Sequence, residues 1–421
     1  MEETYRYMKK VLMITYQYPP YQGSGALQRI LKFSAYLPDM GWQPIILTVW
    51  PQAYENISGD QLCEIPKDVI VKRTFALDAA RHLAINRRYL LFTALPDRWV
   101  SWWFSAVPVG LFLIRKYKPD IIWSTYYIPT AHLIGLTLHH FTGIPWVADF
   151  RDPMTEKGYP YDPTIRKIYR WIERHTIKQC SRAVFTAPGT LNVYAERYPD
   201  MPKSHWAMIA NGYDEEDFIR AEQDLVKKKP LDNRTILVHS GALYQKERDP
   251  TLFFVILSEL YKTGKISPSD LKIVLRAPTY ETYYRKKIQE TGIEKIVFIE
   301  PLVSHQEAIK EMLNADGLLL FWSHDMCNYQ IPAKTYEYLR ARRPIFSMLD
   351  SEGDTAKLLK KIGINTIVPP DSKEEIREGF LNFLSQVRKG HMPALNDDEI
   401  KKYTRKMGTM ELAKILEAAQ F

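Results

Sequence analysis

The sequence predicts two doubly wound α/β domains, in which helices cover both faces of a parallel sheet. Short apolar runs alternate with amphipathic stretches in the first half of the chain, and the same pattern restarts after about residue 230. Continuous apolar runs of this kind are typical of strands that are buried on both faces. The length of 421 residues also suits two domains better than one.

Each half contains enough strands for a sheet of its own. In the first half we expect a helix over 28–37 and strands over 11–15, 44–49, 120–124, 146–149 and 183–186. In the second half we expect strands over 235–239, 271–275, 296–299, 317–321 and 344–347, and helices over 250–263, 280–291, 305–314 and 334–341. Strands that alternate with helices favour a parallel order.

The domain boundaries follow from these elements. We expect a first domain over 1–212 and a second over 213–401, with a C-terminal helix at about 402–421 that packs back on the first. The polar stretch 211–233 is the predicted linker. Ligands of doubly wound sheets bind at the carboxyl ends of the strands. Two facing domains would therefore place a site in the cleft between them.

The net charge of +8 lies in one half of the chain. Residues 1–210 hold 25 Lys and Arg against 17 Asp and Glu, whereas the remainder holds 32 of each. This asymmetry indicates an anionic partner for the first half, or else a basic surface that is only solvated. We expect no nucleic acid as that partner, because no nucleic-acid-binding motif or Arg-rich stripe is present.

Cysteine content and apolar segments indicate a cytoplasmic protein. The three cysteines are far apart and match no metal spacing, so we expect reduced thiols. We expect no signal peptide, since the opening residues are polar and charged. The longest uncharged apolar stretch, Trp99 to Ile114, is shorter than the ~20 residues that cross a bilayer and contains Pro108.

A glycine-containing turn follows the first predicted strand. It reads Pro19-Pro20-Tyr21-Gln22-Gly23-Ser24-Gly25 and precedes the first helix. Gly23, Ser24 and Gly25 there would let backbone N–H groups and the helix N-terminus approach an anion. The alternative is a plain strand-to-helix turn, and the spacing is not that of the dinucleotide-binding fingerprint.

Charged residues follow the predicted strand 146–149. Asp149, Arg151 and Asp152 come directly after a buried run, in the position where α/β sheets hold ligands. A structural ion pair is the alternative. His132 lies alone on a predicted helical segment, and a lone helical His is more often structural.

The second half carries two further motifs. Ser240 and Gly241 repeat the strand–glycine–helix pattern, and Lys246 and Arg248 follow closely. These basic residues suit a pyrophosphate, or else are ordinary surface residues beside a helix start. The more specific motif runs from Gln330 and Ile331 to Lys334, which begins a helix, and Glu337, one turn later on the same face. Lys334 and Glu337 could hold a phosphate and a ribose diol, or could form an ordinary salt bridge.

In this order the motifs resemble glycosyltransferase family 4, in the branch found in bacterial polysaccharide gene clusters. The resemblance spans nearly the whole chain. It rests on Pro19-Pro20 with the glycine turn, Arg29, Gly41-Trp42, residues 119–153, the turn Asn211-Gly212-Tyr213-Asp214, and residues 236–250 and 330–345. It implies the GT-B fold and a hexosyltransferase-type enzyme without a cofactor or metal. Such an enzyme would move a sugar from a UDP- or GDP-sugar, with retention of configuration, to a saccharide or lipid-linked acceptor.

The resemblance also implies roles for individual residues. Glu337 matches the second Glu of the family's Glu-x7-Glu motif and would hold the ribose, whereas Tyr329 replaces the first. Asp325, Asn328 or backbone N–H groups of the 325–331 loop would then contact the donor sugar. Lys246 or Arg248, together with Lys334, would hold the pyrophosphate, and Asp149 and His132 would act on the acceptor side.

Two rival functions and one possible partner accompany this prediction. The rivals are a nucleotide-sugar 2-epimerase of the same fold and a non-catalytic partner subunit, the latter supported only by Tyr329. The segment 98–118 mixes aromatic and basic residues, which suits a helix at an anionic membrane surface on the inner face of the plasma membrane. The alternative for this segment is a helix buried against the sheet.

Overall fold

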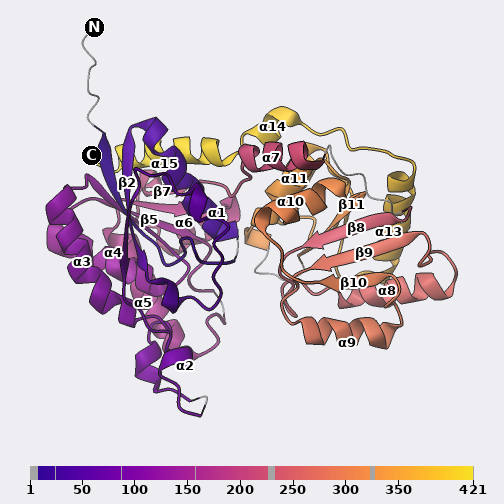
Figure 1. Ribbon diagram of the computed structural model, residues 1–421, viewed down its shortest axis with the longest axis horizontal. Helices are drawn as coiled ribbons and strands as arrows, with labels where there is room; N and C mark the ends of the chain where they lie inside the picture. Colours follow the sequence, from indigo (N-terminus) through magenta and orange to yellow (C-terminus); the bar gives the residue numbers. More distant parts are fainter. Residues whose placement is uncertain are drawn as a thin grey trace, which may run out of the picture. The chain divides into compact units, whose positions relative to one another are not determined.

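The computed structural model describes residues 8–23, 25–86, 88–156, 158–225, 233–322 and 328–420. The chain divides into two compact units (Figure 1). Unit 1 comprises Met1–Ala210 with Arg405–Phe421, and unit 2 comprises Asn211–Thr404. Each unit contains one parallel sheet with helices on its faces, which confirms the predicted fold class.

Unit 1 is built on a seven-stranded parallel sheet of order β3-β2-β1-β4-β5-β6-β7. The strands are β1 Lys9–Ile14, β2 Trp42–Val49, β3 Ile70–Thr74, β4 Ile121–Thr125, β5 Trp146–Arg151, β6 Arg182–Phe185 and β7 Trp206–Met208. The helices are α1 Gly25–Tyr36, α2 Ala79–His82, α3 Ser101–Tyr117, α4 Pro129–Thr142, α5 Pro163–Gln179, α6 Pro188–Arg197 and α15 Arg405–Ala418. The strand order reverses between β1 and β4, which makes that point the expected ligand position.

The two faces of this sheet bury different side chains of the same strand. Along β1, Leu12 and Ile14 belong to one hydrophobic cluster, together with Trp102 of α3. Val11 and Met13 belong to the other, together with Leu412 of α15. Alternate residues of a strand point to opposite faces, so a continuous apolar run is what a sheet covered on both faces requires. Helix α15, from the far end of the chain, packs against α1.

Unit 2 repeats this plan with a six-stranded parallel sheet of order β10-β9-β8-β11-β12-β13. The strands are β8 Thr235–Ser240, β9 Leu271–Arg276, β10 Val297–Glu300, β11 Gly317–Trp322, β12 Ile345–Leu349 and β13 Ile367–Val368. The helices are α7 Glu215–Leu225, α8 Thr251–Lys262, α9 Glu281–Thr291, α10 His305–Asn314, α11 Ala333–Ala341, α12 Asp354–Ile362, α13 Lys373–Arg388 and α14 Asp397–Lys401. The strand order here reverses between β8 and β11.

The predicted linker 211–233 is not a free connection over its described part. It contains α7, which packs against α10 in unit 2. Glu215 and Glu222 of α7 both pair with Arg340 of α11, at 2.7 and 2.8 Å. Just before α7, Gly212 lies so close to the chain that an added Cβ would be 2.1 Å from the carbonyl oxygen of Tyr403. Packing and ion pairs therefore make this polar stretch part of unit 2.

The aromatic segment at the start of α3 packs on the sheet of unit 1. Trp102 is completely buried, and its Nε1 donates to Thr74 Oγ1 at 2.9 Å. Trp103 donates to Thr137 of α4 at 3.0 Å. Trp102 is therefore a core residue, as in the alternative of a helix buried against the sheet, whereas Phe104 and Phe112 of the same helix are exposed. Membrane association of the segment stays a prediction. No helix of the described residues is long and apolar enough to cross a membrane.

Candidate functional site

The carboxyl end of β8 forms the floor of the candidate donor site in unit 2. The strand ends at Ser240, whose N–H donates to Tyr338 Oη of α11 at 2.8 Å. Gly241 follows with a φ of 91°, a conformation that favours glycine. A Cβ at Gly241 would lie 3.5 Å from Lys334 Nζ. The turn therefore brings the β8 backbone close to the first turn of α11, as the two motifs predicted from sequence require.

Lys334 and His239 form the centre of this site. Lys334 lies in the first turn of α11, and its Nζ is 3.0 Å from His239 Nε2. His239 Nδ1 contacts the Leu319 carbonyl at 2.9 Å, so Nδ1 carries the proton and Nε2 accepts from the ammonium. Burial, followed by the charge of Arg248, holds the pKa of Lys334 well below its usual value. Burial and the Lys334 charge likewise lower the pKa of His239.

Lys334 has no ion-pair partner in the part of the chain that the structure describes, although Glu337 lies close enough to favour its charged form. The Arg248 guanidinium adds to the positive potential and lies over the Trp322 ring, 4.3 Å from its centroid. Clustered cations beside a helix N-terminus and a glycine turn bind phosphate groups well. Lys246 is exposed on the same loop.

Glu337 lies one helical turn beyond Lys334 and contacts a residue that sequence reasoning missed. Its Oε1 is 3.0 Å from Nε2 of His305, the first residue of α10. On its other side, His305 Nδ1 is 3.8 Å from Asp217 Oδ2. The side chains of Glu337 and His305 are 17% and 25% exposed, so a ligand hydroxyl can reach both. His305 directly follows the loop after β10. This position near the carboxyl end of a strand was the only sequence feature that could have marked His305 as a site residue.

Backbone contacts hold the segment before α11. The Asn211 side chain donates to the Ile331 carbonyl at 3.4 Å, and Thr355 Oγ1 donates to the Gln330 carbonyl at 2.9 Å. Asn328 donates to Asp350 at 2.7 Å. The predicted catalytic residue Asp325 lies outside the described residues, so its role stays a prediction.

The predicted acceptor-side residues lie in unit 1, where the Asp149 carboxylate forms a buried ion pair. Arg29 Nε donates to Asp149 Oδ2 at 3.1 Å, and both side chains are completely buried. Arg29 also donates to the carbonyls of Ile209 and Ala210, each at 3.0 Å. The structural alternative, an ion pair, therefore describes the environment of Asp149. Direct contact between Asp149 and an acceptor stays a prediction.

His132 is buried in α4 near the carboxyl end of β4. Its Nδ1 is 2.8 Å from Ser124 Oγ, which also accepts from Trp146 Nε1 at 2.8 Å. Burial, with a smaller contribution from Arg151, lowers the pKa of His132 to about 3. The ring is therefore neutral at physiological pH.

The glycine turn of unit 1 is only partly described. Gly23 is described and Gly25 begins α1, whereas Ser24 lies outside the described residues. The turn is held against the 56–58 segment by two backbone bonds, Gln22 N–H to Asn56 O and Ser58 N–H to Pro20 O. An anion at this turn stays a prediction.

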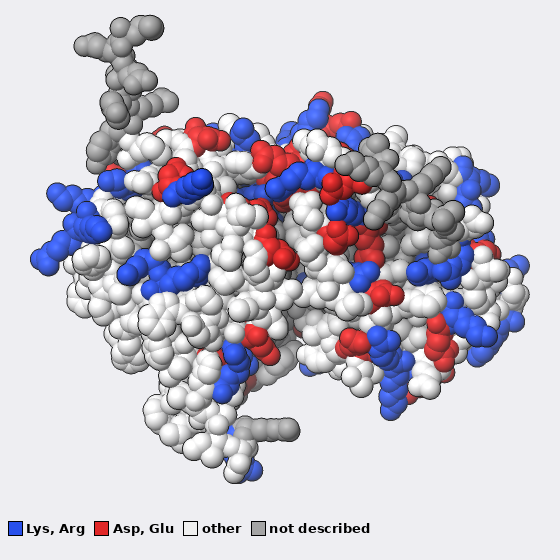
Figure 2. All heavy atoms as spheres, in the orientation of Figure 1, with Lys and Arg blue, Asp and Glu red and all other residues white. Residues whose placement is uncertain are grey.

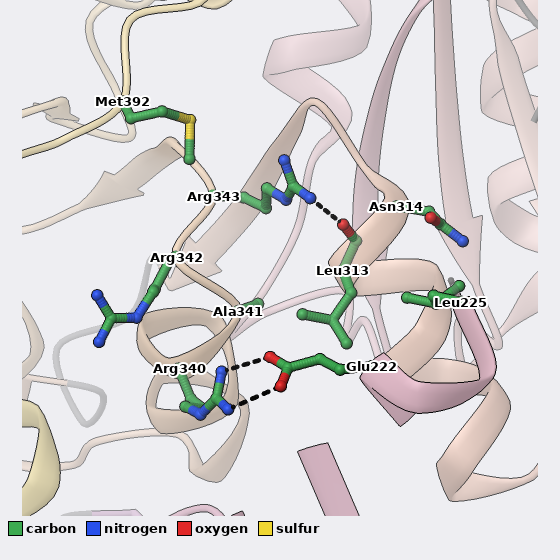
Figure 3. A pocket seen from close by; sticks show the side chains of 9 residues that line it. All are labelled: Glu222, Leu225, Leu313, Asn314, Arg340, Ala341, Arg342, Arg343 and Met392. Carbon is green, nitrogen blue, oxygen red and sulfur yellow. Dashed lines mark hydrogen bonds and ion pairs between the residues drawn. The ribbon is translucent and has the colours of Figure 1, made fainter. Parts of the chain in front are cut away.

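A pocket of about 420 Å³ in unit 2 has a different character (Figure 3). It is lined by the carboxyl end of α11 and by the ends of α7 and α10. Its Arg340 is paired with Glu222, and its Arg343 donates to the Leu313 carbonyl (Figure 3). Lys334 lies at the other end of α11. Since the Arg340 charge is already balanced, this pocket is not the candidate donor site.

Comparisons with known proteins agree with this geometry. Residues 23–217 match the model of Glycosyltransferase Family 4. No curated protein matches the chain significantly.

Solved structures match over nearly the whole chain. Sucrose-phosphate synthase from Thermosynechococcus elongatus has a TM-score of 0.68 at 12% identity, covering 97% of this chain and 98% of its own. WaaG, a glycosyltransferase involved in lipopolysaccharide biosynthesis, has a TM-score of 0.60 at 13% identity, covering 97% and 98%. UDP-GlcNAc 2-epimerase from Neisseria meningitidis, bound to UDP-GlcNAc, has a TM-score of 0.57 at 14% identity, covering 97% and 100%.

The structural likeness and the family match support different conclusions. At such low identities the structural likeness shows the fold alone, which an epimerase shares with the transferases. The family match is to a glycosyltransferase model and covers residues 23–217, which include Gly23, His132 and Asp149. The chain therefore has the GT-B fold and carries a glycosyltransferase family 4 domain over residues 23–217.

Proposed function

We propose that the enzyme transfers a sugar, with retention and without a metal, from a UDP- or GDP-sugar to a saccharide or lipid-linked saccharide in polysaccharide biosynthesis. The observation that carries the proposal is the Lys334–His239 contact beside Gly241, with Arg248 close by. Breaking the bond between sugar and diphosphate builds negative charge on the leaving group. Cations held in place before the reaction stabilise that charge without reorganisation.

The other donor contacts have matching chemistry. Glu337 lies one helical turn after Lys334 on α11 and contacts His305 of α10, and a ribose follows directly on the diphosphate of a nucleotide. A carboxylate accepts hydrogen bonds from both hydroxyls of a diol, which is the role we propose for Glu337. The structural neighbour bound to UDP-GlcNAc supports a uridine nucleotide as one candidate donor.

The donor proposal is tested by calorimetric titration of the full chain with UDP and GDP. We expect one of them to bind, and the Lys334→Met variant to bind it much more weakly. Arg340→Met is the matched control, because this arginine lies on the same helix but is already paired with two glutamates. Equal nucleotide affinity in Lys334→Met and wild type would contradict the proposed site.

Transfer and epimerisation are separated by the acceptor. The epimerase rival has support in a solved structure of the same fold. An epimerase changes the sugar of its nucleotide without any second substrate, whereas a transferase needs an acceptor. Incubation with labelled nucleotide sugar, with and without a membrane-lipid extract, should place label in the lipid only when the extract is present. Conversion of the nucleotide sugar in the absence of extract would favour the epimerase.

A membrane surface is a further proposed partner. The segment of unit 1 that supports it lies after α2 and does not include Trp102 or Trp103. Ile85 and Phe92, which flank the loop after α2, are 79% and 71% exposed, and Leu90 and Leu91 are exposed as well. Residues 79–118 hold seven Arg and Lys but one acidic residue, Asp97, which is buried. On the face shown in Figure 2, the surface over α2 and α3 carries no acidic groups. Exposed apolar groups beside basic ones suit an anionic lipid surface.

The membrane proposal is tested by co-sedimentation with anionic and neutral liposomes at low and high salt. We expect binding to anionic lipid that falls as salt rises, since screening weakens the basic contribution. Replacing Leu91 and Phe92 by Ser should reduce binding about tenfold. The matched control is Trp171→Ser, because Trp171 is half-exposed elsewhere on unit 1. Binding that is unchanged in the double variant would contradict this surface.

A further inference from the structure

Arg151, the last residue of β5, is a buried cation with unsatisfied side-chain nitrogen atoms in the described part of the chain. It is 7% exposed, and in the described part of the chain neither its Nε nor its Nη1 has an acceptor. Its backbone has a φ of 58°, a strained conformation for a residue with a side chain. The register of β5 against β6 also shifts between Asp149 and Arg151. Strained residues and unsatisfied buried groups are both rare in folded proteins and gather at functional sites.

Arg29, a second buried arginine of the same unit, shows what a structural arginine looks like here. It is paired with Asp149 and donates to two backbone carbonyls. All of its charge is therefore compensated within unit 1. Arg151 has no such partners, although Asp149 and Asp152 are near enough to favour its charged form. The difference indicates that Arg151 is held for a partner that the described part of unit 1 does not supply.

His132 presents a further donor beside Arg151. Its ring lies 4.7 Å from the ring of Phe150, the residue before Arg151. The Arg151 charge contributes to the lowered pKa of His132, so the two side chains interact electrostatically. His132 Nε2 is buried and has no partner among the described residues, and it carries the ring proton in the tautomer in which Ser124 donates to Nδ1. Arg151 and His132 thus offer three nitrogen atoms without acceptors.

A group that only accepts hydrogen bonds is the kind of partner that these nitrogen atoms lack. Phosphate and carboxylate are such groups, and arginine binds both well. The position also fits a ligand, because these residues lie at the carboxyl ends of β4 and β5, next to the strand reversal between β1 and β4. Gln17, just beyond β1, is completely buried with both side-chain polar atoms without partners, and adds to the unsatisfied polar groups.

We infer that Arg151, together with His132, binds an anionic phosphate or carboxylate group of the acceptor substrate. The donor diphosphate is the less suitable ligand, because unit 2 holds its own cations for it. The acceptor would accordingly be a sugar that carries a phosphate, as a lipid-linked saccharide does, or a uronic acid. This inference rests on the proposed transfer only in naming the acceptor, and its test requires no transfer.

Thermal unfolding of the full chain tests the inference with simple anions. The measurements are made in the Lys334→Met background, so that the donor-site cluster contributes little. The probes are inorganic phosphate, a sugar phosphate and glucuronate, with neutral glucose as the negative control. We expect at least one anion to raise the melting temperature by a few degrees. Addition of Arg151→Met should abolish that rise, and Arg151→Lys should keep part of it.

The variants alone distinguish a binding role from a structural one. Without ligand, Arg151→Met should melt at or above the wild-type temperature, because it removes a buried charge that lacks a partner. Arg29→Met should melt several degrees lower, because it leaves Asp149 buried and unpaired. Melting of Arg151→Met as low as that of Arg29→Met, or an anion response that survives Arg151→Met, would overturn the inference.

Two further comparisons identify the bound anion and its substrate. Whichever of sugar phosphate and glucuronate raises the melting temperature more identifies the anionic group of the acceptor. The wild-type chain is then titrated with the anion in the presence of saturating UDP or GDP. We expect the response to persist, whereas its loss would assign the anion to the donor and overturn the acceptor assignment. No response to any anion would also overturn the inference, whatever the outcome for nucleotide binding in unit 2.

Discussion

The proton balance of Lys334 allows the sharpest test of the donor site. In the free protein its pKa lies well below 10.5, mainly because the ammonium is buried and Arg248 is near. A bound diphosphate brings negative charge to the same place, which favours the charged ammonium and raises the pKa again. Nucleotide binding should therefore take up as much as one proton. Affinity should rise as pH falls between the lowered pKa of the free protein and the restored pKa of the complex.

The magnitude follows from the two states of this side chain. Each pKa unit by which nucleotide binding raises the pKa of Lys334 corresponds to about 1.4 kcal/mol of binding free energy. Removing the ammonium by Lys334→Met also removes its charge-assisted hydrogen bonds to phosphate, which contribute about 1.5–3 kcal/mol. We expect the variant to bind the nucleotide about 10- to 150-fold more weakly. The free variant should be at least as stable as the wild type, because a buried charge without a carboxylate partner is gone.

The assay is calorimetry in two buffers of different ionisation enthalpy. The difference in observed heat reports the protons taken up, and the wild-type result is compared with Lys334→Met and Lys334→Arg. Lys334→Met should take up fewer protons, because it has no ammonium. Lys334→Arg should keep much of the affinity without proton uptake by this residue, since a guanidinium stays charged. Equal proton uptake in wild type and both variants, or a wild-type affinity no more pH-dependent than theirs, would refute this reasoning.

The remaining predictions concern the ribose contact, the metal and the buried ion pair. Glu337→Ala should weaken nucleotide binding by about 1.5–3 kcal/mol in calorimetry while the fold survives, and unchanged affinity would refute its ribose role. Transfer should continue in excess chelator, since the sequence lacks an Asp-x-Asp motif; recovery only with added Mg²⁺ or Mn²⁺ would contradict this. Asp149→Asn should lower the free energy of unfolding of unit 1 by about 3–5 kcal/mol in urea titrations, because Arg29 stays buried without its counter-charge, and an unchanged midpoint would exclude a structural pair.

Elements with strong apolar runs could be predicted from sequence, whereas polar or very short ones could not. β1 and β11 are buried on both faces, so their composition alone marks them as strands. β13 has two residues and carries no detectable pattern. Helix α7 is rich in acidic residues and was predicted as linker. Its stability comes from Phe218 buried on one face and from Glu215 and Glu222 paired with Arg340, a residue more than 100 positions away.

The candidate donor site could be predicted in part for the same reason. Lys334 and Glu337 belong to one local motif on one helix, so their common face follows from helical periodicity. His239 and His305 belong to other elements and carry no motif. They reach the site because parallel strands bring their carboxyl ends to one edge of the sheet, which brings the ends of β8 and β10 and the start of α11 into one neighbourhood.

The sequence by itself determined the class of fold, the presence of two sets of strands and the family resemblance. These features depend on local periodicity and on short motifs. Only the tertiary structure decided which charged residues are balanced. Arg29 is paired with Asp149, whereas Arg151 is buried with two side-chain nitrogen atoms that have no acceptor among the described residues. That difference arises from contacts between residues as many as 181 positions apart. Charge compensation depends on distances in space, which local sequence patterns do not record.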